Sequence, residues 1–180
     1  MKVGSRVSHL FLRWLTVSLT GACLTLCTAR ADVLTFEAYM DPSQEIPPHN
    51  TPGYGDATLT LDTTSGFVTN VNGSFSDLLA GATRVSLNDA GYGTNGPTIF
   101  TFSLDGSAGL TSGTFGGYGT LTSGQITDML NSNTYINISD SVYPSGEIRG
   151  QLILVPEPST VALACLGLAG LFVVRRWPAL

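Results

Sequence analysis

Between residues 33 and 155, apolar and polar residues alternate with a period of two over many short stretches. In residues 57–61 the odd positions are apolar and the even ones are threonines, a pattern typical of a strand with one buried face. Gly, Asn, Asp and Pro separate these stretches at short spacing, as in all-β proteins. We predict strands at residues 33–39, 56–62, 67–75, 83–87, 98–104, 112–118, 135–138 and 146–155.

A single short stretch has helical spacing. Ile126, Met129 and Leu130 would lie on one face of a helix at residues 124–130, with Thr122 or Ser123 as its N-cap. About eight short strands and one helix predict an all-β fold, either an antiparallel β-sandwich or a Greek-key barrel.

The last predicted strand also contains a charged pair of residues. Ile148, Leu152 and Leu154 should point to one side of it, whereas Glu147 and Arg149 should share the other side and pair. The sequence leaves two roles open for this pair: contact with a small molecule or glycan, or a structural ion pair with Glu45 nearby.

The two ends of the chain do not follow the strand pattern. At the N-terminus, a basic region is followed by an apolar segment at residues 14–27 and by Ala29 and Ala31 in an A-x-A cleavage signature. This order predicts a secretory signal peptide at residues 1–31 and a mature N-terminus at Asp32. A lipoprotein site at Cys23 is the alternative, although its spacing is poor.

At the C-terminus, Pro156, Glu157 and Pro158 precede an apolar run of 14 residues, 161–174, which Arg175 and Arg176 close. As a helix this run is ~21 Å long, which is short of the ~30 Å hydrocarbon core of a bilayer. The arginines should stay in the cytoplasm and place everything before Pro156 outside.

This tail resembles the PEP-CTERM sorting signal of Gram-negative bacteria at its VPEPST core, its apolar segment and its terminal basic pair, within residues 156–180. The resemblance implies export, an intermediate held in the inner membrane, and cleavage near the Pro-Glu-Pro by an exosortase-type enzyme. It further implies a cell-surface or extracellular destination. A permanent transmembrane anchor is the alternative.

Without the two terminal segments, the chain is strongly acidic. Residues 32–155 hold twelve acidic residues, two basic ones (Arg84 and Arg149) and no lysine, which is a formal net charge of −10. Such a surface disfavours nucleic acid, because binding to phosphates needs clustered Lys and Arg. Calcium is a weak prospect at the oxygen-rich loop of residues 88–96, which fits no EF-hand spacing.

Candidate chemistry is sparse in the predicted domain. All three cysteines lie in the terminal segments, so residues 32–155 have no disulfide and no thiolate site. His49 lies in a proline-rich loop, and there is no G-x-S-x-G motif. We therefore predict no catalytic, cofactor-binding or metal-binding residue and a non-enzymatic protein, with a carboxylate-dependent hydrolase as the least favoured alternative.

Residues 32–155 resemble a CHRD domain, the module first named in chordin. The matching blocks are Phe36-Glu37-Ala38, Gln44-Glu45-Ile46-Pro47-Pro48, Gly55-Asp56-Ala57-Thr58-Leu59, Tyr135-Ile136-Asn137-Ile138 and residues 143–152. The resemblance implies a β-rich extracellular domain. It also implies histidines in a middle strand and after the Tyr-x-Asn segment, but Arg84, Ser86 and Ser139 occupy those positions here.

The sequence therefore predicts an exported, exosortase-sorted surface or matrix protein with a structural or adhesive β domain. Its expected partners are the inner membrane before processing, the sorting enzyme and an exopolysaccharide. A glycan- or calcium-binding module is the alternative, with Tyr118, Glu147 and Arg149 as the candidate ligand contacts.

Overall fold

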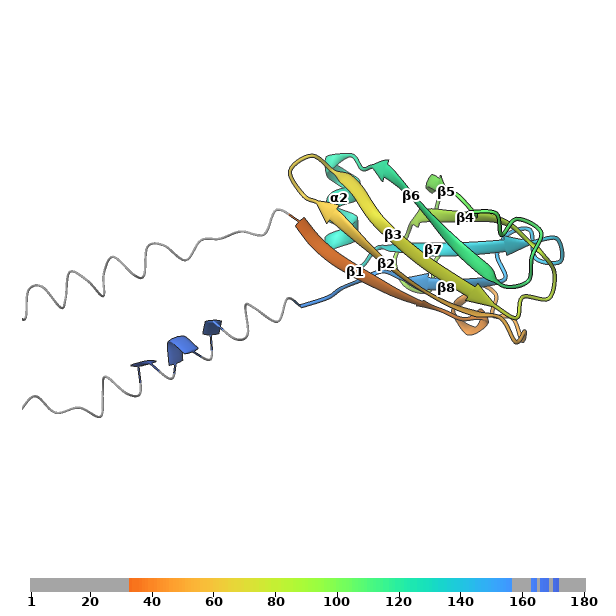
Figure 1. The fold of residues 1–180 in the computed structure, drawn as a ribbon, viewed down its shortest axis with the longest axis horizontal. Helices are drawn as coiled ribbons and strands as arrows, with labels where there is room; N and C mark the ends of the chain where they lie inside the picture. The colour runs from red at the N-terminus through yellow and green to blue at the C-terminus, as the bar shows by residue number, and fades with distance from the viewer. Residues whose placement is uncertain (1–32, 157–162, 165, 169, 172–180) are drawn as a thin grey trace, which may run out of the picture. The chain divides into compact units, whose positions relative to one another are not determined.

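The computed structural model describes residues 33–156, 163–164, 166–168 and 170–171 (Figure 1). The described residues from 163 onward are helical. The predicted signal peptide with Ala29 and Ala31, half of the predicted apolar run at residues 161–174, and Arg175 and Arg176 lie outside the described residues. Within the described part, none of the helices is long and apolar enough to cross a bilayer.

Nine strands form two antiparallel sheets in the described part of the chain. The five-stranded sheet has the order β6-β3-β2-β1-β9 and the four-stranded sheet the order β5-β4-β7-β8. The fold is therefore the predicted sandwich and not a closed barrel. The strands are β1 (Val33–Met40), β2 (Tyr54–Asp62), β3 (Phe67–Ser76), β4 (Ala82–Asp89), β5 (Thr98–Phe102), β6 (Gly113–Thr120), β7 (Thr134–Asp140), β8 (Ile148–Gln151) and β9 (Ile153–Leu154).

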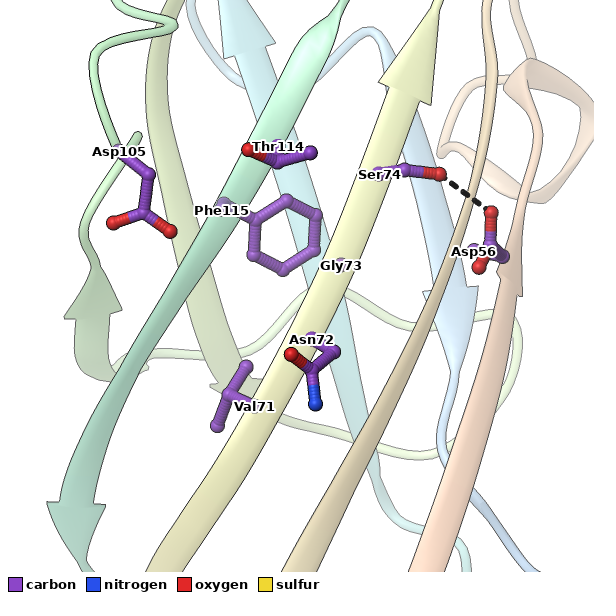
Figure 2. A pocket seen from close by; sticks show the side chains of 8 residues that line it. All are labelled: Asp56, Val71, Asn72, Gly73, Ser74, Asp105, Thr114 and Phe115. Carbon is purple, nitrogen blue, oxygen red and sulfur yellow. Dashed lines mark hydrogen bonds between the residues drawn. The ribbon is translucent and has the colours of Figure 1, made fainter.

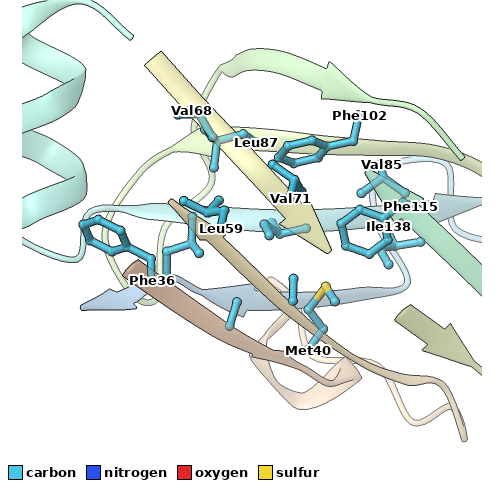
Figure 3. Close-up of a cluster of buried hydrophobic side chains, with 14 of the residues drawn as sticks. Phe36, Met40, Leu59, Val68, Val71, Val85, Leu87, Phe102, Phe115 and Ile138 are labelled. Carbon is cyan, nitrogen blue, oxygen red and sulfur yellow. The ribbon is translucent and has the colours of Figure 1, made fainter. Parts of the chain in front are cut away.

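The hydrophobic core fills the space between the two sheets (Figure 3). Alternation along β2 buries Ala57, Leu59 and Leu61 and leaves the threonines on the outer side, as the sequence pattern predicts. Other strands contribute in the same way. The side chains labelled in Figure 3 are Phe36, Met40, Leu59, Val68, Val71, Val85, Leu87, Phe102, Phe115 and Ile138.

The predicted helix forms as α2 (Ser123–Leu130) and uses Thr122 as its N-cap. The Thr122 hydroxyl accepts from the backbone N–H of Gln125, while the Gln125 side chain accepts from the backbone N–H of Thr122. This capping box satisfies two backbone donors at the helix start. A one-turn 3₁₀ helix, η1 (Pro42–Gln44), follows β1.

The prediction of a single strand at residues 146–155 is wrong in one respect, because this segment divides between the two sheets. β8 pairs with β7 in the four-stranded sheet, whereas β9 pairs with β1 in the five-stranded sheet. Leu152, at the crossing, is buried and donates its backbone N–H to Thr134. The change of sheet leaves Leu154 partly exposed instead of buried beside Ile148 and Leu152.

The crossing brings the two ends of the domain together. The backbone N–H of Val155 donates to the carbonyl of Thr35 over 2.9 Å, so the chain beyond β9 still runs along β1. Two isolated bridges, Asp41 with Arg149 and Ser103 with Gly116, also join the sheets at their sides. The first described residue, Val33, therefore lies close to the start of the predicted sorting signal.

Candidate functional site

A polar hollow of about 360 Å³ opens on the outer face of the five-stranded sheet. Figure 2 shows Asp56 on β2 at one side and Asp105, in the loop after β5, at the other, with β3 and β6 between them. Asp56, Ser74 and Thr114 form one row across three strands, because Asp56 pairs with Ser74 and Ser74 with Thr114.

Gly116 and Gly73 allow close packing beneath this hollow. Gly116 pairs with Asn72 on the row next to Ser74, and a Cβ at Gly116 would approach the carboxylate of Asp105. On the inner side, a Cβ at Gly73 would collide with the ring of Phe115. Any larger side chain at Gly73 would displace that ring, so this glycine is needed for the packing under the hollow.

Within residues 33–156, several polar groups of the hollow are free to bind a ligand. The hydroxyl of Ser74 donates to Asp56 over 2.6 Å and so orients that carboxylate. The Asp105 carboxylate and the Thr114 hydroxyl have no hydrogen-bond partner in this part of the chain, and Asn72 uses only its amide nitrogen, toward the Asn70 carbonyl.

An exposed aromatic pair lies farther along the same face. Tyr118, a predicted ligand contact, is 75% exposed, and its ring centroid is 6.1 Å from that of Phe67. A Cβ at Gly119 would meet the ring of Phe100 in the other sheet, so Gly119 faces inward and Tyr118 outward. Tyr118 and Phe67 thus extend the hollow's face toward the end of β6.

The other two predicted ligand contacts are buried. Glu147 is 0% exposed and Arg149 is 1% exposed, so neither is open to solvent as their alternation predicts. The Arg149 guanidinium lies 3.7 Å from the centre of the Tyr135 ring and donates through Nη1 to Thr94 and Asn95. Their role as ligand contacts stays a prediction.

Glu147 has different partners from Arg149, which explains why the expected pair is absent from the described contacts. Its carboxylate accepts from the backbone N–H of Leu79 at 3.0 and 3.1 Å, while Asp140 accepts from the N–H of Ala80 at 2.9 Å. Burial, and then the neighbouring Asp140, raise the pKa of Glu147. This carboxyl pair is sealed inside the domain, where it holds the turn between β3 and β4.

Polar residues concentrate on the side of β4, β7 and β8 that faces away from the core. Arg84 pairs with Ser139 and Ser86 with Asn137, which pairs in turn with Arg149. Arg84 is exposed, while the other four are buried and each keeps one atom without a partner among the described residues. The three positions where the CHRD resemblance implies histidines are therefore neighbours here, but they carry an arginine and two serines.

Glu45, in the segment after η1, packs against this layer of buried polar residues. It is 5% exposed, and burial raises its pKa to about 7 despite the opposing charge of Arg149. A Cβ at Gly146 would meet both the Glu45 carboxylate and the Asn137 amide oxygen, so Gly146, with a φ of +146°, allows this close approach.

A metal site is not evident in the described part of the chain, where no group of three or more His, Cys, Asp and Glu residues could hold an ion. Some oxygens of the loop at residues 88–96 are already engaged by protein donors. Asn88 donates to the Gly96 carbonyl, and the carbonyl of Thr94 accepts from Arg149. Calcium binding there stays a prediction.

Of the residues singled out in the predicted sorting signal, namely Pro156, Glu157, Pro158, Arg175 and Arg176, the structure describes Pro156, which is exposed and directly follows Val155. Glu157 and Pro158 lie outside the described residues. No sequence pattern indicated the hollow, because its residues come from four separate segments between positions 56 and 115.

Comparison with known families confirms both resemblances. Residues 36–152 match the CHRD domain family, and residues 154–176 match the PEP-CTERM protein-sorting motif. The chain belongs to the CHRD domain family. No curated protein and no solved structure matches it. The sorting motif indicates exosortase-dependent export to the cell surface, and neither module is a catalytic type.

Proposed function

We propose that this protein is a non-enzymatic structural component of the cell surface or extracellular matrix, delivered there by exosortase sorting. The observation that carries the proposal is the direct succession of the two modules. The CHRD match ends at residue 152 and the sorting motif begins at 154. Val155 is still hydrogen-bonded to β1, so the sorting motif adjoins the folded domain.

The surface of the domain supports an extracellular structural role. Residues 32–155 lack lysine and carry a formal net charge of −10. The outer face of β2 presents Tyr54, Asp56 and Thr58 to solvent and leaves Thr60 and Asp62 partly exposed. A net negative charge keeps a secreted domain soluble and apart from anionic lipid surfaces.

Delivery would pass through three steps in order. The signal peptide of residues 1–31 directs export, the inner membrane holds the tail of residues 156–180, and the exosortase-type enzyme releases the domain. An exopolysaccharide is the proposed partner at the destination.

The test is the intact mass of the protein recovered from the envelope and the culture medium of the producing cells. We expect a species that begins at Asp32 and ends near residues 156–159. Replacing Arg175 and Arg176 with alanine should hold the protein in the inner-membrane fraction with its tail uncleaved. An Arg84→Ala variant, which removes a basic residue from the domain and not from the signal, is the matched control and should be sorted normally.

A species that keeps residues 161–180 in the wild-type membrane fraction would contradict the proposal and indicate a membrane-anchored periplasmic protein. Loss of the surface species in the Arg84→Ala strain would show that fractionation reports folding instead of sorting.

Among the alternatives, glycan binding is favoured by one specific observation, the polar hollow with its adjoining aromatic pair. Calcium binding and hydrolysis have no comparable support. The carboxyl pair of Asp140 and Glu147 is buried and engaged by backbone N–H groups, so it does not present a cleft to a substrate.

A further inference from the structure

The outer face of the five-stranded sheet combines three features in one continuous surface: the hollow, its unpartnered polar groups and the aromatic pair. The hollow has a volume of about 360 Å³, within the range of small-molecule and oligomer subsites. No residue that lines it is basic.

The two carboxylates are placed for an extended ligand and not for a single ion. Asp56 is on β2, and Asp105 lies beyond β6, so two strand spacings separate β2 from β6. Neighbouring strands are ~4.8 Å apart, which puts the strands that carry the two ends of the hollow roughly 10 Å apart. One cation cannot contact both carboxylates at coordination distance.

The groups between the carboxylates match a ligand rich in hydroxyls. Carboxylate oxygens accept from hydroxyls, the Asn72 amide both donates and accepts, and the Thr114 hydroxyl does the same. Figure 2 shows Asn72 and Thr114 between Asp105 and Asp56, on β3 and β6. Neighbouring hydroxyls of a sugar could bond to successive members of this row.

The aromatic pair supplies an apolar surface in line with the hollow. Thr114 and Tyr118 are four residues apart on β6, a distance of ~13 Å along the strand. The exposed rings of Tyr118 and Phe67 can cover the apolar face of a ring that continues past the hollow. The surface therefore follows β6 and fits a chain of several sugar units.

Charge selects among the glycans. Asp56 and Asp105 would repel uronate, sulfate or phosphate groups, and no lysine or arginine of the hollow offsets them. We propose that this face, along β3 and β6 from Asp105 and Asp56 to Tyr118, binds a neutral polysaccharide. The inference rests on the proposed surface or matrix function and names its ligand class and its site.

The experiment uses protein released from the surface of the producing cells, so that each variant has passed through normal sorting. Retardation is measured in native gels containing the cells' own exopolysaccharide, separated by anion exchange into neutral and acidic fractions. The variants are Asp105→Asn, Asn72→Ala and Tyr118→Ala. Asp128→Asn, which makes the same charge change on α2, is the matched control.

We expect retardation by the neutral fraction that persists in excess chelator. Asp105→Asn and Asn72→Ala should each weaken it about tenfold, which corresponds to one lost hydrogen bond to a charged or well-placed group. Tyr118→Ala should weaken it by a similar factor, because it removes the apolar ring surface. The control should behave like wild type. Asparagine tolerates the positive φ of 46° at residue 105, so Asp105→Asn tests the carboxylate without backbone strain.

The inference would be overturned by no retardation by the neutral fraction, by retardation unchanged in all three site variants, or by equal retardation by the acidic fraction. Each would leave the sorting result intact, because release from the surface is scored separately by mass. Dependence on calcium would likewise overturn it in favour of an ion-mediated contact.

Discussion

The guanidinium of Arg149 lies inside the domain, between the Tyr135 ring and the loop that carries Thr94 and Asn95. A buried charge is tolerated only when neighbouring dipoles and charges compensate it. Here backbone and side-chain oxygens and the ring face do so, and the Glu45 carboxylate adds its charge. Arg149 thereby ties β8 to two loops distant in sequence.

Glu45 gives the domain a defined pH dependence. Its pKa is raised from 4.5 to about 7 by burial, so the folded state binds this proton more tightly than the unfolded state. The stabilisation is complete below about pH 4.5 and is lost as pH rises through about 7. We expect the wild-type Tm to fall between pH 5 and pH 8, and the Glu45→Gln variant to show a smaller fall.

Scanning calorimetry across this range checks the prediction through the difference between the two proteins. The pKa of Glu147 is raised as well, so this residue gives both proteins a pH dependence of the same sign. That contribution cancels in the comparison. An identical fall in both proteins would contradict the assignment to Glu45.

At the residue scale, sequence reasoning placed exposed Tyr118 correctly but not the pair in the last strand. Strict alternation would put Glu147 and Arg149 on one open face. Instead η1, the segment after it and the loop of residues 90–97 cover Arg149, through contacts such as Asn95 with Ile46 and Gln44 with Gln151. The turn at Leu79 covers Glu147. Periodicity within one strand cannot show that loops distant in sequence cover one of its faces.

At the scale of elements, most boundaries follow from local chemistry. The helix starts where the sequence offers a capping residue, and several strands end near a glycine or aspartate with positive φ, such as Gly66 after β2, Asp77 after β3 and Asp105 after β5. The split between β8 and β9 does not follow, because it depends on which sheet each half meets. Only the long-range pairings of β7 and β1 decide it.

The capping box of α2 allows the two cap candidates to be separated. Thr122→Ala should lower the free energy of unfolding by about 1 kcal/mol, because it removes the acceptor for the Gln125 N–H. Ser123→Ala, at the first helical position, should change it by less than about 0.5 kcal/mol. Urea denaturation measures both, and a larger loss in the Ser123 variant would contradict the observed cap.

At the scale of the whole molecule, alternation and turn residues predicted an all-β domain with good strand positions, and the family resemblance agreed with the outcome. Periodicity alone left sandwich and barrel open, because it reports which side of a strand is buried and not which strands pair. The hollow needed the three-dimensional register of β2, β3 and β6 with the loop at Asp105, so no local pattern could predict it.

The position of the two arginines has a consequence for survival outside the cell. Trypsin-like proteases cut after Lys or Arg and need a flexible loop at the cut. Between residues 33 and 156 they find only Arg84, in β4, and buried Arg149, in β8. We expect this region to stay whole in native trypsin digests followed by mass spectrometry, and rapid cutting after Arg84 would refute that. The domain should therefore resist secreted proteases that cut after Lys or Arg.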